Sequence, residues 1–591
     1  IIQLDHDFNE RAIGRNPSQF IEGFNSFLLF ETIAAKAQCL EQRLGKNTSE
    51  SERNQAVNTY RSALSLADHI EKVFDTEEAR LFALKKIVPV QQRAVSLLVQ
   101  LYEQTQKETY LEEAFRRCEQ SKAAVLFIGQ KENESKANTG IPDSLLQRER
   151  NLKFTLSQLF VRIDRATEDA EISRLRTDIR DTKLALSRMA DQLHDYPEYY
   201  RKKFGADTID LRFLRRQVLD RKTALLSFFQ TEETTYTFVL TRNELRFHRI
   251  PNDRVFQKQL TSLVTALRSA IPGEDYLAEP QAQYLYRRLI EPLAKYLADK
   301  TSLIIIPHND LTQLSFDVLE NEQQQYLLEQ FDITYQYSAS FLRPESKPLL
   351  VPNQMLAVAP FNVTGLGNGM GVLPASELEV SGLKGMKLTN QNATKTRFLQ
   401  LARQASIIHL ATHAIANNDR PDQSYIAFAP QPNAENKLYA HELQYGILDK
   451  VKLVFLSACE TASGQLIRGE GVMSLSRALS YAGCPNLITS LWKAEDNATA
   501  YISRQFYTHL DEGNTVSRSL QLAKLDLLQN SQYAQFHAPP YWSHLVFVGS
   551  PPEHKSTGLL WLLAGISGVL VLIGWRFRQN SAQKKITVSI Q

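Results

Sequence analysis

One histidine and one cysteine stand near the ends of two separate apolar runs, a pairing that could supply a nucleophile and its base. Residues 405–414 reach His413 and Ala414, and residues 451–461 reach Cys459. Each run is rich in apolar, partly β-branched residues, which is typical of a strand buried on both faces of a parallel sheet. The carboxyl ends of such strands form the crevice where α/β proteins carry out chemistry. A thiol and an imidazole delivered there can act as nucleophile and base.

A second histidine, His409, lies four residues before His413 within the first run. Four residues of extended strand span about 13 Å, so only one of the two imidazoles can face Cys459. This spacing on a strand also prevents the two histidines from binding one metal ion, whereas the same spacing on a helix would allow it. Because His409 lies deeper in the apolar run, His413 is the candidate base, and no metal is expected.

The composition is that of an ordinary globular protein. Of the 591 residues, 43% are hydrophobic and 23% charged, and 68 basic against 65 acidic residues give a formal net charge of +3. This balance gives no electrostatic reason to expect a nucleic-acid partner. The length exceeds what one hydrophobic core supports, so roughly three or four domains are expected. The four cysteines are too few and too scattered for a disulfide framework and are predicted to be free thiols.

The pattern of apolar residues changes along the chain from helical to strand-like. Residues 1–140 predict helical hairpins that resemble degenerate tetratricopeptide repeats, with an irregular helical domain as the alternative. Residues 144–215 predict a long antiparallel helix pair, a hairpin or coiled-coil-like linker. From residue 220 to 551, a small meander leads into strands that alternate with helices, which indicates an α/β domain with a mainly parallel sheet. The predicted fold class is therefore multidomain, first all-α and then α/β.

Residues 558–575 contain no charged side chain and predict one C-terminal transmembrane helix. These 18 residues would span about 27 Å as a helix, close to the hydrocarbon thickness of a bilayer. Trp561 and Trp575 lie near the two ends, where their rings favour the membrane interface. A buried core helix is the alternative.

The charges around this run suggest how it would be oriented. A basic tail follows at 576–591, so the positive-inside rule favours a single-pass protein with a cytoplasmic tail and a non-cytoplasmic main part. A cytoplasmic main part anchored by its tail stays open as the alternative. The chain opens at Ile1 without a methionine or a signal peptide, which suggests that the true N-terminus, with any signal sequence, is missing.

A set of short segments is distinctive when taken together. They are Leu303 to Leu319, Leu373-Pro-Ala-Ser-Glu, His409-Leu-Ala-Thr-His-Ala, Leu456-Ser-Ala-Cys-Glu-Thr, Gly469-Glu-Gly-Val-Met-Ser-Leu-Ser-Arg-Ala, Ala482-Gly-Cys-Pro, Ser490-Leu-Trp-Lys-Ala-Glu-Asp and Ser543-His-Leu-Val-Phe-Val-Gly. Together these motifs resemble the CHAT family, caspase-like cysteine peptidases that commonly follow tetratricopeptide repeats. The resemblance covers about residues 220–551 and implies a pseudo-catalytic half at 220–350 and a catalytic half at 351–551.

The resemblance implies a Cys/His dyad, with Cys459 as nucleophile and His413 as base. The family position for the base lies just beyond the strand and precedes a small residue, here Ala414. The backbone amides of Ala414 and Cys459 would stabilise the oxyanion. Ser457, Glu460 and Asp496 are candidates for a substrate pocket. Ser457 stands where arginine- and lysine-cleaving relatives often carry an acid, so a basic substrate preference has no direct support.

Two functions from different classes follow. In the first, the chain is a membrane-tethered cysteine endopeptidase without a cofactor, whose helical repeats dock a protein substrate or receive a regulatory partner. In the second, it is a repeat scaffold or signalling adaptor whose caspase-like domain serves protein interaction. Retention of both His413 and Cys459 favours the peptidase. The resemblance also suggests a bacterial source.

Overall fold

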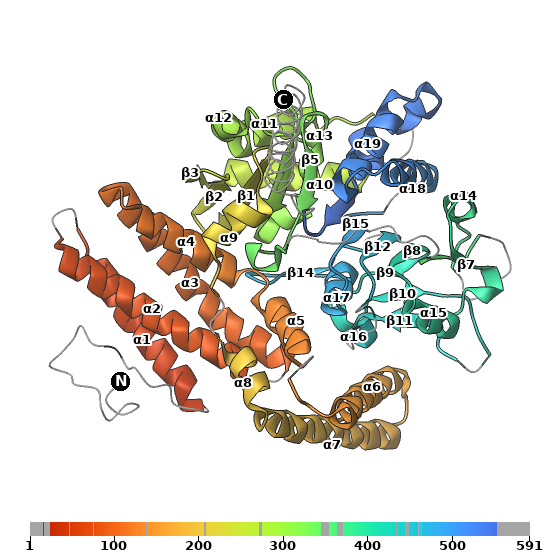
Figure 1. The fold of residues 1–591 in the computed structure, drawn as a ribbon, viewed down its shortest axis with the longest axis horizontal. Helices are drawn as coiled ribbons and strands as arrows, with labels where there is room; N and C mark the ends of the chain where they lie inside the picture. Colours follow the sequence, from red (N-terminus) through yellow and green to blue (C-terminus); the bar gives the residue numbers. More distant parts are fainter. Residues whose placement is uncertain are drawn as a thin grey trace, which may run out of the picture.

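The fold is that of a computed structural model of the chain. The structure describes residues 16, 24–45, 48–74, 76–136, 139–205, 208–270, 275–343, 354–362, 370–432, 434–443, 448, 450–458, 461–462, 464–493 and 495–551. An N-terminal helical region comes first, and an α/β part with a mainly parallel sheet follows it (Figure 1). The predicted order of fold classes is therefore confirmed for these two parts.

The helical region is built from paired helices. Its helices are α1 (Phe24–Gln42), α2 (Glu50–Val73), α3 (Glu77–Thr105), α4 (Glu108–Ser121), α5 (Ala124–Lys136), α6 (Asp143–Arg165), α7 (Asp169–His194), α8 (Pro197–Phe204) and α9 (Leu211–Phe213). Helices α1 and α2, α3 and α4, and α6 and α7 pack against each other in sequence order (Figure 1). Ser49 and Glu52 form a capping box at the start of α2, which satisfies backbone donors there.

The helices pack directly on the sheet. The side chains of Leu98 and Phe115, on α3 and α4, belong to the same buried cluster as Leu225, Phe238 and Ile304 of the sheet. The rings of Phe115 and Phe238 meet edge to face, with their centroids 5.8 Å apart. The helical region and the sheet therefore share one hydrophobic core.

The α/β part contains one eleven-stranded sheet among the described residues, in the order β3-β2-β1-β4-β5-β16-β15-β12-β8-β6-β7. Its first elements are β1 (Thr223–Gln230), β2 (Thr234–Leu240), β3 (Leu245–Pro251), α10 (Arg254–Arg268), α11 (Glu279–Leu289), α12 (Ala294–Leu297), β4 (Ser302–Ile306), α13 (Leu327–Gln330) and β5 (Asp332–Tyr335). The predicted meander is the antiparallel set β1, β2 and β3.

The remaining elements complete this sheet and form two further small sheets. They are β6 (Met355–Ala359), α14 (Ala375–Ser381), β7 (Met386–Thr389), α15 (Lys395–Ala402), β8 (Ile407–Ala411), β9 (Ala414–Ile415), β10 (Tyr425–Ala427), β11 (Lys437–Tyr439), α16 (Ala440–Leu443), β12 (Leu453–Ser457), β13 (Gln465–Ile467), β14 (Gly471–Met473), α17 (Leu475–Tyr481), β15 (Leu487–Ser490), α18 (Asp496–Asp511), α19 (Val516–Gln529) and β16 (Leu545–Val548). Strands β9, β10 and β11 form a separate sheet, and β13 and β14 form a hairpin.

The parallel strands on the two sides of the sheet run in opposite directions. Strands β1, β4 and β5 are mutually parallel, and β5 is parallel to β16. Strand β16 is antiparallel to β15, which is parallel to β12 and, through β12, to β8. The carboxyl end of β4 therefore lies at one edge of the sheet, and the carboxyl end of β8 lies at the opposite edge.

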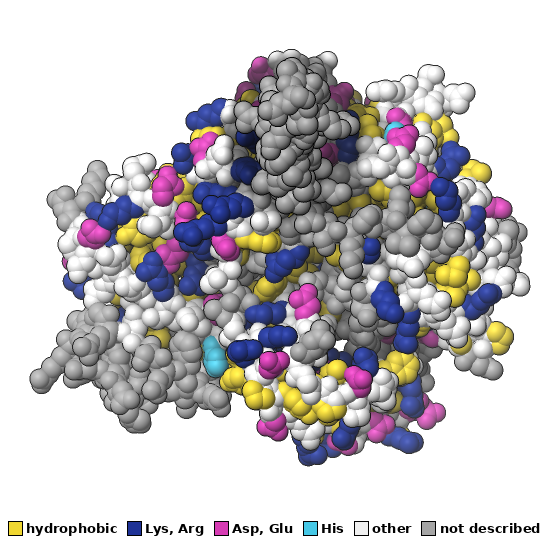
Figure 2. Space-filling model, in the orientation of Figure 1, with side chains coloured by type: hydrophobic (Ala, Val, Ile, Leu, Met, Phe, Trp, Pro, Cys, Tyr) yellow, Lys and Arg dark blue, Asp and Glu magenta, His cyan; other side chains and the backbone are white. Residues whose placement is uncertain are grey.

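Side chains of both charge signs are interspersed on the face of the molecule drawn in Figure 2. Aspartate and glutamate side chains lie among the lysine and arginine side chains there, over the helical region and the α/β part alike. Such mixing fits the small net charge of +3.

The predicted transmembrane helix at 558–575 lies outside the described residues. Within the part of the chain that the structure describes, no helix combines the length and the apolar character needed to cross a bilayer. The longest helices, α3 and α7, carry charged side chains along their length, which a membrane span of about 20 apolar residues excludes. This finding contradicts the predicted single-pass membrane localisation with a non-cytoplasmic main part, which is wrong as it stands.

Candidate active site

The two apolar runs form neighbouring parallel strands of the sheet, β8 and β12. Their register pairs Ala411, the last residue of β8, with Ser457, the last residue of β12. His413 is the second residue after β8, and Ala458 follows β12 directly. Because parallel strands end at the same edge, the residues that follow them are delivered to one side of the sheet.

Two of the predicted site residues, Cys459 and Glu460, lie outside the described residues. Their roles therefore stay predictions. The structure does describe Ser457 and Ala458, which lead directly to Cys459 in the chain. These two residues line the same pocket as His413.

The ring of His413 is held from two sides. Its Nε2 atom lies 2.7 Å from the backbone carbonyl oxygen of Gly371, and its ring centroid lies 5.0 Å from that of Phe361. The backbone N–H of Leu373 donates to the carbonyl of Phe361 at 2.7 Å. This hydrogen bond holds the segment that contains Gly371 near the carboxyl end of β6. Since a carbonyl only accepts, Nε2 must carry the proton, and Nδ1 of a neutral imidazole then keeps its lone pair.

A small pocket opens beside His413. It is lined by residues from the loop before α14, from α14, from the ends of β8, β12 and β15, from α18 and from the start of β16. These residues are Leu373, Ala375, Ser376, Glu379, Ala411, Thr412, His413, Ser457, Ala458, Ser490, Asp496, Thr499, His544 and Leu545. The structure thus brings His413, Ser457 and Asp496 together, although they are far apart in sequence.

Two carboxylates and a second imidazole shape the electrostatics of this pocket. Burial raises the pKa of Asp496 above its ordinary value, and the charges of Glu495 and Glu379 raise it further, while His413 opposes the shift. Glu379 is 4% exposed, so its charge acts through a poorly hydrated environment. His544 is fully buried, and burial lowers its pKa to about 3, so this imidazole is neutral at pH 7.

His409 lies inside the core. It is 0% exposed, its Nδ1 lies 3.1 Å from the hydroxyl of Tyr507, and its ring centroid lies 4.9 Å from that of Phe455. Its Nε2 lies 3.2 Å from Glu379 Oε1, but the geometry is not that of a hydrogen bond, and the two atoms are only in close contact. His409 does not line the pocket that contains His413.

The backbone at Ala414 is set by the small sheet. The N–H of Ala427 donates to the carbonyl of His413 at 2.9 Å, and the register pairs Ala414 with Ile426. In an antiparallel pair, residues alternate between hydrogen-bonded and non-hydrogen-bonded positions. Ala414 is at a non-hydrogen-bonded position, so its N–H points away from β10.

Sequence reasoning missed the Gly371 carbonyl, the Phe361 ring and Glu379. A carbonyl acceptor leaves no sequence signal, because every residue has one. The acidic residue Glu379 follows the Leu373 motif closely, and that proximity was the one available signal. Among the described residues, no group of three or more His, Cys, Asp or Glu side chains is arranged to hold a metal ion.

Comparisons with known proteins extend this picture. Residues 279–550 match the model of the family described as the CHAT domain. Two similar curated proteins are both named tetratricopeptide repeat protein 28. The mouse protein is 25% identical over 351 residues, 49% of this chain and 14% of its own length, and the human protein is 24% identical over 393 residues, 56% of this chain and 15% of its own length. The chain therefore spans only about a seventh of the length of these relatives.

Solved structures with similarity include a separase–securin complex from Saccharomyces cerevisiae. The match has a TM-score of 0.42 at 10% identity and covers 91% of this chain and 51% of the other. A second is the Arg-specific cysteine proteinase gingipain R, with a TM-score of 0.31 at 11% identity, covering 50% of this chain and 75% of the other.

Proposed function

We propose that the chain, whose residues 279–550 match the CHAT domain and which is similar to tetratricopeptide repeat proteins, is a cysteine endopeptidase that uses Cys459 and His413. The observation that carries this proposal is the position of His413. Its ring stands at the carboxyl ends of β8 and β12, beside the residues that lead into Cys459, and the Gly371 carbonyl fixes its tautomer.

The proposed reaction begins with proton transfer from the Cys459 thiol to Nδ1 of His413, because the thiolate is the nucleophile. The sulfur forms a bond to the carbonyl carbon of a peptide, and the electron pair of the C=O bond moves to oxygen. When the tetrahedral intermediate collapses, the C–N bond breaks and His413 returns its proton to the leaving amine. Water, deprotonated by His413, then hydrolyses the acyl-enzyme and releases the carboxylate product.

The oxyanion would be bound by the backbone amides of Ala414 and Cys459. The register of β9 supports the first of these, because the Ala414 N–H is not used by β10. One such donor typically contributes about 3 kcal/mol to the transition state. Substituting Ala414 by proline would remove this donor without changing either reacting side chain.

The substrate is proposed to be a protein or peptide that enters the pocket beside His413. Ser457 and Asp496 line this pocket, and Glu460 is proposed to join them. Residues 1–140, the linker at 144–215 and the halves at 220–350 and 351–551 are the proposed functional units. The helical repeats would dock the substrate or a regulatory protein partner. A bacterial source likewise stays a prediction.

A second function is favoured by one observation. The curated relatives are named for their tetratricopeptide repeats, which fits a repeat scaffold or signalling adaptor whose caspase-like domain binds proteins without cleaving them. The two functions differ in whether Cys459 is chemically activated.

Labelling by an electrophilic peptide separates the two functions. We expect the probe to react at Cys459 in the full chain and not to react at this position in Cys459→Ala. In His413→Ala the rate should fall by about 100-fold or more. Cys39 is an exposed free cysteine, so the labelled site must be mapped by mass spectrometry. Cys484→Ala is the matched control, since Cys484 is buried and should not change the rate. Equal labelling of all the variants would favour the scaffold.

A further inference from the structure

The corner between α4 and α5 contacts both sides of the sheet. On one side, the Glu119 carboxylate accepts hydrogen bonds from Lys122 Nζ at 2.7 Å, from the Ala339 N–H at 2.7 Å, and from the Ser227 hydroxyl. The Glu119 side chain is 0% exposed and that of Lys122 is 2% exposed. The helical region is therefore fixed to the half of the sheet that carries β1 and β5.

On its other side, the same corner holds the hairpin of β13 and β14, residues 465–473. The N–H of Ala123 donates to the carbonyl of Gly469 at 3.0 Å. The N–H groups of Val125 and Leu126, in the first turn of α5, donate to the Glu470 carboxylate at 3.0 and 2.9 Å. A carboxylate at a helix N-terminus satisfies donors that the helix itself leaves free.

The charge of Glu470 is balanced by Arg477 of α17. The guanidinium donates to Glu470 Oε1 at 2.5 Å and to Glu77 Oε1, at the start of α3, at 2.6 Å. The side chains of Glu470 and Arg477 are 0% and 4% exposed. Burial raises the pKa of Glu470 above its ordinary value, and Arg477 and the two amides oppose that shift. Each member of this cluster is therefore needed to keep the others satisfied.

The turn of the hairpin has a backbone that suits this contact. Gly469 has a φ of +81°, and a Cβ at this position would lie 2.7 Å from a methyl carbon of Val88 on α3. Glycine thus allows both the left-handed conformation and the close approach to the helical region.

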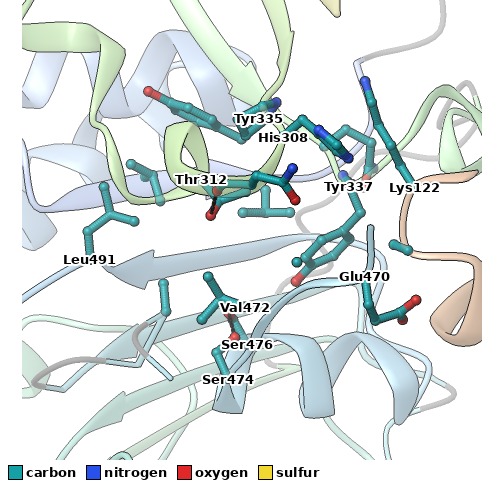
Figure 3. Close-up of a pocket in the computed structure, with 18 of the residues that line it drawn as sticks. Lys122, His308, Thr312, Tyr335, Tyr337, Glu470, Val472, Ser474, Ser476 and Leu491 are labelled. Atoms are coloured by element: carbon teal, nitrogen blue, oxygen red, sulfur yellow. Dashed lines mark hydrogen bonds between the residues drawn. The ribbon is translucent and has the colours of Figure 1, made fainter. Parts of the chain in front are cut away.

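Beneath the hairpin, packing is incomplete. A cavity of about 90 Å³ lies between the hairpin, the ends of β4 and β5, and the α4–α5 corner. Figure 3 shows the Glu470 carboxylate turned toward the helical region, while Val472 and Leu491 lie across the cavity. Side chains around a void lack partner atoms on that side, so the contacts of Glu470 contribute more to fixing the hairpin.

The hairpin is also close in sequence to the proposed nucleophile. Between Cys459 and β13, the N–H of Ala462 donates to the carbonyl of Ser490 at 2.8 Å, and after β14 the N–H of Ser476 donates to the carbonyl of Thr461 at 3.1 Å. The segment that follows Cys459 is therefore connected to the hairpin along the chain and, through the Ser476–Thr461 hydrogen bond, to the residues after β14. A displacement of the hairpin would move this segment.

We propose that Glu470 is a positioning residue through which the helical region holds the hairpin and thereby sets the reactivity of Cys459. The proposal rests on the proposed function. A partner that moves α3 or the α4–α5 corner would change the labelling rate of Cys459 without touching the pocket beside His413.

The test compares labelling of the full chain with that of Glu470→Ala, Glu470→Gln and Glu77→Gln. We expect Glu470→Ala to lower the maximal inactivation rate at least about five-fold, with the half-saturating probe concentration within about two-fold. Glu470→Gln keeps one side-chain oxygen that can accept a hydrogen bond from the backbone N–H groups of α5, so it should recover part of the rate. Glu77→Gln, which lies on the helical side, should lower the rate in the same direction. Hydrogen exchange of residues 464–473 should rise in all three variants.

The matched control is Asp317→Asn. Asp317 is another buried carboxylate, and its ion pair, at 3.2 Å, is with Lys524 of α19 rather than with the hairpin cluster. We expect this variant to lower thermal stability while leaving the labelling rate within about two-fold. If Glu470→Ala and Asp317→Asn lower the rate equally, or if Glu470→Ala leaves it unchanged while the unmodified chain labels, the positioning role is overturned. If the unmodified chain itself does not label at Cys459, it is the proposed function that fails.

Discussion

Each side of the sheet delivers a histidine to the same position on a buried parallel strand, but in different surroundings. His308 is the second residue after β4, and His413 is the second residue after β8. Because the two sets of parallel strands run in opposite directions, these imidazoles lie at opposite edges of the sheet. Comparing them distinguishes a histidine that stabilises the fold from one that is proposed to transfer a proton.

His308 is enclosed. It is 4% exposed, its Nδ1 accepts a hydrogen bond from the Gln230 N–H at 3.0 Å, and its ring stacks on Phe229 with centroids 4.9 Å apart. Burial and the nearby Lys122 charge hold its pKa well below the ordinary value, so it stays neutral (Figure 3). His413 instead borders an open pocket, with Nε2 on a carbonyl. A strand end supplies an imidazole, and its neighbours decide whether the imidazole can exchange a proton.

The largest difference is expected in labelling. His413→Ala should lower the rate of Cys459 modification by about 100-fold or more, as expected for a lost general base. His308→Asn should leave the rate within about two-fold, because Asn keeps an acceptor for the Gln230 N–H. The readout is the rate of probe incorporation at Cys459, followed by mass spectrometry. A comparable loss in both variants would remove the distinction between the two edges.

The reverse order is expected for stability. His308→Ala would leave the Gln230 N–H buried without an acceptor and remove the stacking on Phe229, at a cost of about 2–4 kcal/mol. His413→Ala removes a half-buried side chain and should cost less. Urea unfolding followed by circular dichroism measures both. Equal destabilisation would show that His413 is as tightly integrated as His308.

The pH dependence of stability should also come from the buried histidines. In the unfolded chain a histidine has a pKa of about 6.5. Burial lowers the pKa of His308 well below this value and lowers the pKa of His544 to about 3. Below the pKa of the unfolded state, the unfolded chain binds protons that the folded chain does not, so stability is lost as pH falls. Each histidine contributes about 1.4 kcal/mol per pH unit.

The variant His308→Asn removes one of these two contributions. Between pH 6.5 and 5 it should lose about 1–2 kcal/mol less stability than the unmodified chain, as measured by urea unfolding at each pH. The half-exposed His248 gives a control, since His248→Asn should change the slope less. An unchanged slope in His308→Asn would mean that the pKa of His308 is the same in the folded and the unfolded chain.

The sequence was sufficient to predict the strands and the order of the helical and α/β parts. It was not sufficient to predict the direction of β16 or the contacts around the site. The apolar runs around His409 and Val454 predict β8 and β12 because a buried parallel strand has few other patterns. The reversal of direction at β16 depends on its antiparallel pairing with β15, between residues such as Val548 and Leu487, which no local pattern encodes. The contact between the Gly371 carbonyl and His413 likewise could not be predicted, because every residue has a backbone carbonyl.

The smallest expected effect concerns the carboxylates at the two edges. At the first edge, buried Asp317 has a lysine partner, Lys524, at 3.2 Å. At the second, Asp496 and Glu379 line the same pocket, and burial together with the charges of Glu495 and Glu379 raises the pKa of Asp496. Glu379→Gln should therefore lower the pKa of Asp496, but not to its ordinary value, because burial is the larger cause and remains.

Carboxyl carbon NMR on protein labelled at aspartate, assigned with Asp496→Asn, measures this change. Glu377→Gln is the matched control, since Glu377 is an exposed residue of the same helix and should have no effect. If both variants shift the Asp496 titration alike, the interaction is general rather than local to the pocket. A shift in Glu379→Gln alone would establish that this edge keeps two acidic groups in mutual repulsion. A pocket of that kind favours any ligand that brings positive charge or a proton, whereas the edge at His308 has already paired its charges within the fold.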